Sequence, residues 1–254
     1  MTKSAVLLSG GLDSAVLLVD EASRGDVQPI YVSVGLAWER AERRIVDALL
    51  ASPVVAGRVQ PLKSLAVDMR DVYAATHWAV EGKPPSYHTA DEDVYLPGRN
   101  VVLFGKAGVY CAAARIGRIV IGTLKHNPFP DATPEFRTAM AHALSLGLAH
   151  DLRIEAPYAG MSKADVVRRG IALGVPFEWT LSCMSPGTGV ALSGTGVARE
   201  PERHLPTVLP VHCGTCSKCR ERHDAFVDAG VEDPTEYDDR RFVANRSSSQ
   251  HKGH

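Results

Sequence analysis

The sequence has little excess charge of either sign and lacks any long apolar run. Its 28 lysines and arginines nearly balance 29 aspartates and glutamates, which gives a formal net charge of -1. A protein with so little net charge has no surface-wide attraction to nucleic acid or to a membrane. No stretch approaches the roughly 20 apolar residues of a spanning helix, and the chain enters its first apolar run directly after Lys3. We therefore expect a cytoplasmic protein that contacts no membrane and binds no nucleic acid directly.

Cysteine is scarce as well, and its spacing is uneven. Three of the five cysteines are Cys213, Cys216 and Cys219. Such a group is typical of a metal site in a reducing compartment and unlike a disulfide framework. A chain of 254 residues, 45% hydrophobic and 22% charged, buries roughly three quarters of its unfolded surface without such a framework. We expect one large domain with a small appendage.

Short apolar runs alternate with amphipathic patterns, which predicts an α/β fold with a mostly parallel sheet. Helices are predicted to begin at about residue 14 and to cover residues 38–51, 134–150 and 162–173, with a buried helix over residues 100–116. Residues 76–99 contain two proline-rich turns and are predicted to form a long surface loop. The predicted strands are residues 4–8, 29–34, 59–65, 118–122 and 152–156.

The strongest local signal lies between the first predicted strand and the first helix. Leu8 is followed there by Ser9-Gly10-Gly11-Leu12-Asp13-Ser14. Glycines let backbone N–H groups converge on an anion, and a helix N-terminus favours phosphate. Asp13 would repel a bare phosphate, but a Mg²⁺-nucleotide places a cation between the two negative groups. The competing interpretation is a Gly-Gly turn in which Asp13 or Ser14 caps the helix.

This segment is neither a Walker A loop nor a Gly-x-Gly-x-x-Gly dinucleotide loop. It resembles the S-G-G-x-D-S signature of the PP-loop ATP pyrophosphatases. The resemblance implies a Rossmann-like sheet of the adenine nucleotide α-hydrolase type, with ATP and Mg²⁺ bound at residues 8–14. It also implies cleavage of ATP between the α and β phosphates, with AMP transferred to an acyl or carbonyl oxygen.

The cysteine spacing predicts a structural zinc site. Cys213, Cys216 and Cys219 bring three thiolates together, and Cys183 supplies a fourth from upstream. Four thiolates in a tetrahedron favour Zn²⁺ and leave no coordination position for water. Such a site would clamp the C-terminal segment onto the body of the fold.

Other arrangements of the site compete with this one. An iron–sulfur cluster is the rival metal group. His212 or His223 is an alternative to Cys183 as the fourth ligand, although we expect both histidines to be solvated. The fifth cysteine, Cys111, lies in an apolar helical run and is expected in the core.

Further segments, in one order along the chain, resemble the 7-cyano-7-deazaguanine synthase (QueC) family. Leu96-Pro97-Gly98-Arg99-Asn100 is similar to its PGRN segment, and residues 130–136 are similar to its PDCRxEF segment. Residues 161–167 are similar to SKxEIV, residues 180–183 to TxSC, and residues 213–222 to the zinc segment CGxCxxCxxR. The resemblance extends over roughly residues 4–228.

The resemblance implies an ATP-dependent carbon–nitrogen ligase. It would convert 7-carboxy-7-deazaguanine and ammonia into 7-cyano-7-deazaguanine, the precursor of queuosine. The carboxylate would first become an AMP ester, ammonia would give the amide, and a second activation would permit loss to the nitrile. The expected partners are thus a deazapurine carboxylate and ammonia, and a homodimer is compatible with the sequence.

The same resemblance suggests roles for individual polar residues. Asp13, Lys163 and Arg99 are the predicted catalytic residues. Lys163 would neutralise charge that develops on the phosphates, and Arg99 would pair with the substrate carboxylate. Asn100, Asp131 or Glu135 would bind the donor edge of the deazaguanine, so the predicted substrate residues are Arg99, Asn100, Asp131 and Glu135. A helix cap or a surface salt bridge is the competing interpretation for each.

The resemblance also divides the chain. Residues 1–180 are the predicted PP-loop domain, and residues 181–230 form a zinc-binding segment packed on it. Residues 184–210 are predicted to be a flexible insertion or a lid, because Gly, Ser, Thr and Pro dominate them. Residues 231–254 are a tail with a disordered end.

Two segments depart from the family pattern. Residues 32–40 stand where the family carries F-D-Y-G-Q-R-H, and Ala132-Thr133 replaces Cys-Arg beside Asp131. The leading alternative is therefore a divergent ligase that uses the same adenylation to amidate or conjugate another carboxylate, including a deazaguanine-modifying relative. A zinc-containing tRNA-binding module is disfavoured by the near-zero net charge. A sulfur-transfer enzyme would need a reactive cysteine outside the zinc set, where only Cys111 remains.

Overall fold

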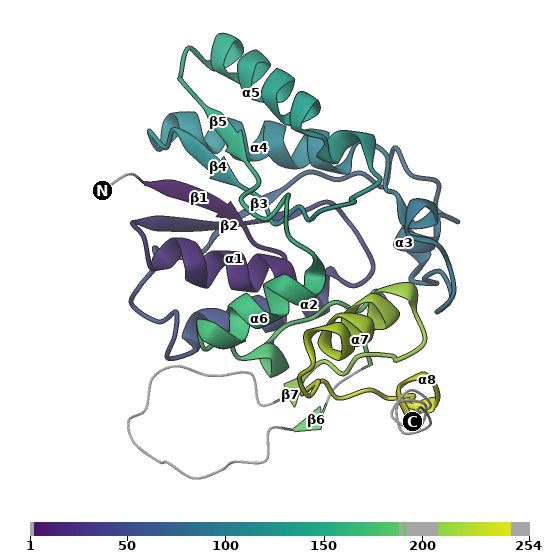
Figure 1. Cartoon of the computed structure of the whole chain (residues 1–254). Helices are drawn as coiled ribbons and strands as arrows, with labels where there is room; N and C mark the ends of the chain where they lie inside the picture. The colour runs from purple at the N-terminus through teal and green to yellow at the C-terminus, as the bar shows by residue number, and fades with distance from the viewer. Residues whose placement is uncertain (1–2, 188–189, 192–207, 245–254) are drawn as a thin grey trace.

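A parallel five-stranded sheet lies at the centre of the protein (Figure 1). The computed structural model describes residues 3–187, 190–191 and 208–244. The strand order is β3-β2-β1-β4-β5, and each neighbouring pair is parallel, so the predicted α/β class is confirmed. The strands are β1 (Ser4–Leu7), β2 (Val27–Ser33), β3 (Lys63–Ala66), β4 (Arg118–Val120) and β5 (Arg153–Glu155).

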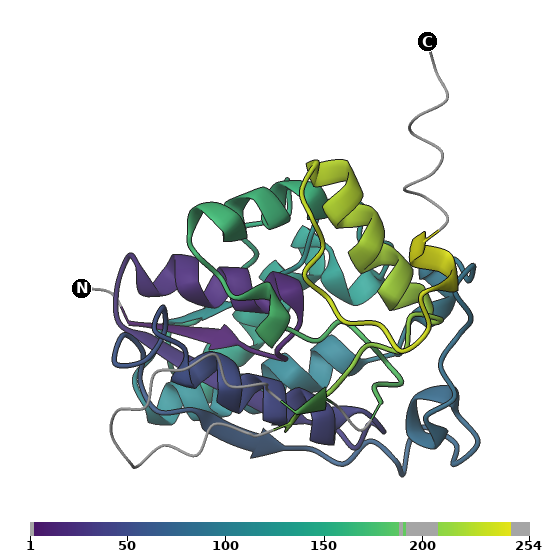
Figure 2. The same cartoon turned by 90° about the horizontal axis from the view of Figure 1, so that it is seen from below.

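Helices cover both faces of this sheet (Figures 1 and 2). One face carries α1 (Leu12–Ala22), α2 (Glu39–Ala51) and α6 (Lys163–Ala172), and the other carries α4 (Arg99–Ala113) and α5 (Pro134–Leu148). Right-handed crossovers explain the division, because the chain moves outward from β1 to β3 and then returns across the sheet to β4. The order therefore reverses between β1 and β4. In sheets wound this way, ligands bind beyond the carboxyl ends of the strands at that reversal.

The core has one apolar layer on each side of the sheet. Leu17 of α1 and Val167 of α6 are fully buried in one layer, and Phe104 of α4 is 1% exposed in the other. Cys111 is fully buried in the same layer as Phe104, which confirms its predicted place in the core. Truncating a side chain like Phe104 to alanine costs about 3–5 kcal/mol.

A C-terminal unit packs beside α6. The helix α7 (Ser217–Ala229) contacts α6, and the short helix α8 (Arg241–Ala244) follows it. The strands β6 (Val190–Ala191) and β7 (Val208–Leu209) form an antiparallel pair before α7. Most of the insertion predicted over residues 184–210, and the end of the tail, lie outside the described residues. Within the described part of the chain, every helix is too short or too polar to cross a bilayer.

Three local predictions were wrong in part. The strand predicted over residues 59–65 begins only at Lys63, because residues 52–58 continue from α2 as hydrogen-bonded turns. The loop predicted over residues 76–99 holds α3 (Trp78–Glu81) and the 3₁₀ turn η1 (Asp91–Val94). The helix α4 is not buried all round, since Val101 and Val109 are 41% and 55% exposed on its outer side.

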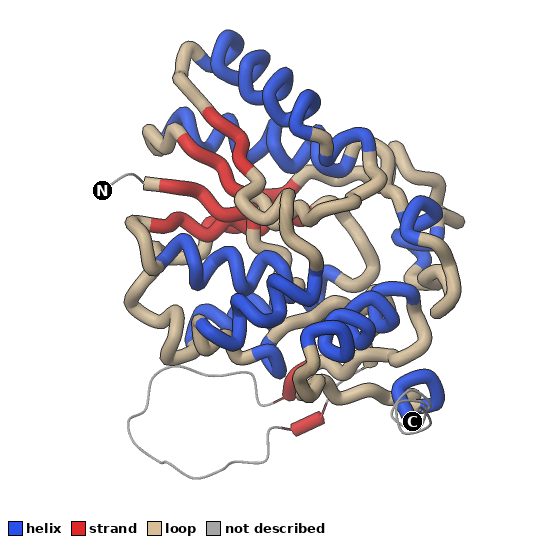
Figure 3. The backbone as a smooth tube through the Cα atoms, in the orientation of Figure 1, coloured by secondary structure: helices blue, strands red, loops and turns tan. Residues whose placement is uncertain are grey.

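Long loop segments gather at the carboxyl ends of the strands (Figure 3).

Candidate active site

A cavity of about 440 Å³ lies at the carboxyl ends of the strands. Two groups of side chains that line it differ in chemistry, and we name them separately. The loop cluster consists of residues 8–14, of which all but Gly10 line the cavity, together with Lys163, Lys218 and Glu221. The aromatic cluster consists of Tyr31, Trp38, Glu42, Trp78 and Arg99.

Backbone geometry shapes the loop cluster. Gly10 has a φ of +78°, and a Cβ atom there would come within 3.1 Å of Ile45 and 3.2 Å of Val46. Only glycine therefore fits this turn. The backbone N–H of Leu181 donates to the Gly10 carbonyl at 2.8 Å, which ties the turn to the segment before Cys183.

The first turn of α1 has no side-chain cap. Its N-cap is Gly11, whose φ of -67° is ordinary, and the Ser14 hydroxyl donates back to the Gly11 carbonyl at 3.0 Å. The interpretation of Asp13 or Ser14 as a helix cap is therefore wrong. N–H groups at the start of a helix that lack an intrahelical partner attract an anion, and the helix dipole adds to that attraction.

Lys163 stands between two carboxylates beside this turn. Its Nζ lies 3.2 Å from Asp13 Oδ2 and 2.6 Å from Glu221 Oε1. Burial lowers the pKa of the Lys163 ammonium, but the attraction of Asp13 and Glu221 outweighs burial and raises the pKa overall. Lys163 is therefore a fixed cation at the mouth of the glycine turn.

Asp13 has one carboxylate oxygen without a partner. Burial raises the pKa of Asp13 more than Lys163 lowers it. Asp13 Oδ1 is buried and accepts no hydrogen bond from the described residues. An unpaired buried oxygen is costly, and a carboxylate oxygen is the kind of ligand that Mg²⁺ prefers. The residues present therefore fit Mg²⁺ at this atom.

Glu221 and Lys218 also belong to the site, although the sequence did not predict them as site residues. The Lys218 ammonium lies 2.6 Å from Glu221 Oε2, while Lys163 occupies Oε1. Burial raises the pKa of Glu221, but Lys163 and Lys218 outweigh it and hold the pKa well below its usual range. The one sequence feature that could have pointed to these two residues is their i, i+3 spacing inside the cysteine-rich segment. Such a charged pair by itself indicates only a solvated helix face.

The aromatic cluster combines flat apolar walls with one buried acid. Trp38 and Trp78 stack with ring centroids 5.8 Å apart. Glu42 is 7% exposed, and it accepts hydrogen bonds from the Tyr31 hydroxyl at 2.9 Å and from Trp38 Nε1 at 3.1 Å. Burial raises the pKa of Glu42, and Arg99 opposes the rise. Sequence reasoning identified Arg99 in this cluster and missed Glu42.

The remaining predicted substrate residues are placed differently. Asn100 donates its backbone N–H to Asp131 Oδ2 at 3.0 Å, and its side-chain amide donates to the Asp131 carbonyl at 3.1 Å and to Oδ1 at 3.3 Å. Both residues line the cavity but bond to each other. Glu135 is exposed in the first turn of α5 and does not line the cavity. The structure thus brings Asp13, Lys163 and Arg99 to one cavity and leaves Glu135 outside it.

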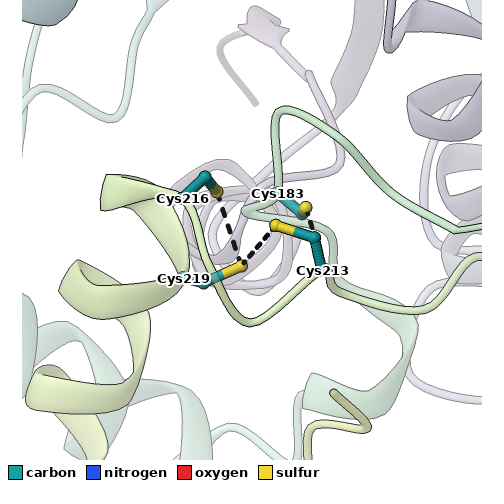
Figure 4. Close-up of side chains that lie close together, drawn as sticks. All are labelled: Cys183, Cys213, Cys216 and Cys219. Carbon is teal, nitrogen blue, oxygen red and sulfur yellow. Dashed lines mark hydrogen bonds between the residues drawn. The ribbon is translucent and has the colours of Figure 1, made fainter. Parts of the chain in front are cut away.

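Four cysteines converge beside the cavity (Figure 4). The sulfur atoms of Cys183, Cys213, Cys216 and Cys219 all lie within 4.8 Å of one another. The Sγ of Cys219 is 3.9 Å from that of Cys213 and 3.5 Å from that of Cys216. Zn–S bonds of about 2.3 Å in a tetrahedron separate the sulfurs by about 3.8 Å. The donor set and spacing fit zinc.

Backbone N–H groups support the sulfurs. Cys213 and Ser185 each donate an N–H to the Cys183 sulfur at 3.3 Å. Gly214 has a φ of +75°, and a Cβ there would collide with the Asp239 carbonyl oxygen at 1.9 Å. The chain beyond α7 therefore folds back tightly over the cysteine turn.

The prediction of solvated histidines was wrong. His212 and His223 are 4% and 7% exposed, and neither belongs to the cysteine group. His212 Nε2 accepts the Ser182 N–H at 3.0 Å, and His223 Nδ1 lies 3.8 Å from Asp233 Oδ2. Both are covered because residues 230–239 pack over α7, which the sequence pattern did not indicate.

The cysteine turn and the loop cluster share one helix. Cys219 and Glu221 both lie in the first turns of α7, so the segment that carries the sulfurs also carries a partner of Lys163. Arg222 of the same helix is fully buried, and it donates to the Phe177 carbonyl and to the Thr180 hydroxyl, each at 2.8 Å. The helix α7 therefore connects the cysteine turn directly to the cavity.

Comparison with known proteins places the chain in a family. The model of the family described as Queuosine biosynthesis protein QueC matches residues 3–230. The chain belongs to the QueC family. The resemblance drawn from the short motifs is thereby confirmed.

Individual QueC-family relatives match nearly the whole chain. The 7-cyano-7-deazaguanine synthase of Methanoculleus marisnigri is 31% identical over 249 residues, covering 94% of this chain and 100% of that protein. That of Methanopyrus kandleri is 34% identical over 255 residues, covering 93% and 99%. Among solved structures, a 4-thiouridine synthetase in complex with RNA and ATP has a TM-score of 0.41 and 14% identity, covering 72% of this chain and 45% of that one.

Proposed function

We propose that this QueC-family protein is an ATP-dependent ligase that converts 7-carboxy-7-deazaguanine and ammonia into 7-cyano-7-deazaguanine. The observation that carries the proposal is the shared cavity, which holds both the loop cluster and the aromatic cluster. Flat aromatic walls suit a planar heterocycle, and the glycine turn with Lys163 suits a polyphosphate. A carboxylate held between them lies next to the group that activates it.

The chemistry needs two activations. The substrate carboxylate attacks the α-phosphorus of ATP, which releases pyrophosphate and leaves an acyl-AMP ester. Ammonia displaces AMP and, after loss of a proton, gives the amide. The amide oxygen attacks the α-phosphorus of a second ATP, which releases a second pyrophosphate, and loss of AMP and two protons from that intermediate leaves the nitrile.

The residues of the chain would supply position and charge. The free N–H groups at the start of α1 and the Lys163 ammonium would face the phosphate oxygens on which negative charge develops. Arg99 has a buried Nε with no partner in the described residues, and it would pair with the substrate carboxylate. Mg²⁺ held by Asp13 would neutralise phosphate charge, and Zn²⁺ held by the four cysteines would stabilise the fold at α7.

A second candidate is a divergent ligase that adenylates a different carboxylate and stops at an amide or a conjugate. One observation favours it, because Trp38 lines the cavity within the segment where the family usually carries polar residues. In that case AMP forms, but no nitrile appears.

Incubation with Mg²⁺-ATP, ammonium and 7-carboxy-7-deazaguanine, followed by mass spectrometry, tests the proposal. We expect the nitrile, with two AMP released per nitrile. AMP with an amide or conjugate as the end product would favour the second candidate. No AMP with this acid would overturn the proposal.

A further inference from the structure

The aromatic cluster contains a buried carboxylate, Glu42, and a half-buried cation, Arg99, that do not pair with each other. Glu42 and Arg99 both line the cavity, where burial raises the pKa of Glu42 and the charge of Arg99 opposes that rise. The structure describes both residues, and they form no ion pair with each other. Arg99 Nε has no hydrogen-bond partner in the described part of the chain. A carboxylate and a guanidinium that line one cavity without pairing fit a ligand that offers N–H donors to one and negative charge to the other.

The other acids near the cavity are already committed. Asp131 accepts hydrogen bonds from Asn100 on both of its carboxylate oxygens. Asp13 and Glu221 bind Lys163, Asp91 has a side chain that is 46% exposed and pairs with Arg220 at 3.4 Å, and Glu135 lies outside the cavity. Among the described carboxylates, Glu42 is therefore the one that combines burial, a place beside the aromatic walls and remaining acceptor capacity.

Glu42 is also held rigidly. The Tyr31 hydroxyl occupies one carboxylate oxygen and Trp38 Nε1 occupies the other, which uses two of about four acceptor positions. Two positions remain for a ligand. Because Trp38 both orients Glu42 and stacks with Trp78, the acid and the flat wall form one unit.

We propose that Glu42 is the specificity residue that binds the N1–H and 2-amino donors of the deazaguanine ring. This inference rests on the proposed function and extends it to base recognition. Two adjacent N–H donors match a carboxylate, whereas an adenine-type edge sets an acceptor nitrogen beside its single amino group and would be repelled. Glu42 would thus admit a guanine-type heterocycle and reject an adenine-type one, including the base of ATP.

The test compares the binding of two acids to the wild type and to the Glu42→Gln variant. The acids are 7-carboxy-7-deazaguanine and its analogue without the 2-amino group, and binding is followed by quenching of tryptophan fluorescence from Trp38 and Trp78. We expect the wild type to prefer the first acid by about 100-fold, the range set by charged hydrogen bonds. Glu42→Gln should reduce that preference to below about tenfold and leave the KM for ATP unchanged.

Glu39→Gln is the matched control. Glu39 lies on the same helix, but its carboxylate accepts the N–H groups of Val34 and Gly35 and does not line the cavity. The control should keep the preference. Tyr31→Phe, which leaves the Glu42 carboxylate in place, serves if Glu42→Gln does not fold, and it should lower the preference by a smaller factor.

The outcomes separate the two proposals. An unchanged preference in folded Glu42→Gln, or a rise in the KM for ATP equal to that for the acid, overturns the role of Glu42. If the wild type prefers the 2-amino acid but forms no nitrile, base recognition by Glu42 stands and the proposed function fails. If the wild type binds neither acid, both fail.

Discussion

The two clusters that line the cavity are built in opposite ways. Most of the loop cluster comes from residues 8–14, which are contiguous, and its shape depends on backbone geometry at Gly10. The aromatic cluster takes Tyr31 from β2, Trp38 and Glu42 from the start of α2, Trp78 from α3 and Arg99 from α4. Under the proposed function, the contiguous residues would bind the phosphates and the dispersed residues would select the substrate. Substitutions in the loop cluster should therefore lower ATP cleavage, whereas substitutions in the aromatic cluster should lower the affinity for the acid.

The largest effect is expected at the loop cluster. Asp13→Asn should lower ATP cleavage by about 10³-fold, because it removes the anionic oxygen that would hold Mg²⁺. Binding of the deazapurine acid and the zinc content should remain. Pyrophosphate release and metal analysis measure these quantities. Cleavage within tenfold of the wild type would show that Asp13 is not needed at the phosphates.

A change at the cysteines should disturb both clusters through stability. Cys216→Ser should lose zinc and lower the free energy of unfolding by more than about 4 kcal/mol, as expected for loss of a structural metal. Metal analysis and thermal unfolding report this result. Cys111→Ser is the control for zinc content and should keep a full zinc equivalent, since Cys111 lies apart from the four-cysteine group. A Cys216→Ser protein with a full zinc equivalent would place the metal elsewhere.

The aromatic cluster should respond in substrate affinity alone. Trp78→Ala removes half of the stacked wall and should raise the KM for the acid by about 10- to 100-fold, the range of one base–aromatic stack. The KM for ATP should stay within about twofold. Steady-state kinetics with each substrate varied in turn separates the two. An increase confined to ATP would assign this wall to the nucleotide.

The smallest effect is expected at Glu221. Glu221→Gln leaves Lys163 with Asp13 as its one carboxylate partner among the residues that the structure describes, and it should lower kcat/KM for ATP by about tenfold. The pKa of Glu221 is depressed in the folded protein, so its contribution to stability is present above its ordinary pKa of 4.5 and is lost as the pH falls further. The wild type should therefore be the more stable protein at pH 7, with a gap that narrows in acid. A gap that widens in acid would contradict this sign.

The same contrast explains what could be predicted from the sequence. The glycine turn and three of the cysteines are local patterns, and a parallel sheet follows from alternating runs, so these were predicted and the fold class was confirmed. Glu42 and Glu221 have no local signature, because their importance depends on which helix packs beside which strand. The same holds for His212, which is buried by residues 230–239 that return over α7.

The most direct test of the account follows the oxygen atoms of the acid. 7-Carboxy-7-deazaguanine labelled with ¹⁸O in both carboxylate positions is incubated with Mg²⁺-ATP, ammonium and the zinc-loaded protein, and AMP is analysed by mass spectrometry. Adenylation of the acid and then of the amide predicts that each released AMP carries one ¹⁸O atom. Nitrile formation with unlabelled AMP, or with the label in inorganic phosphate, would contradict activation by adenylation.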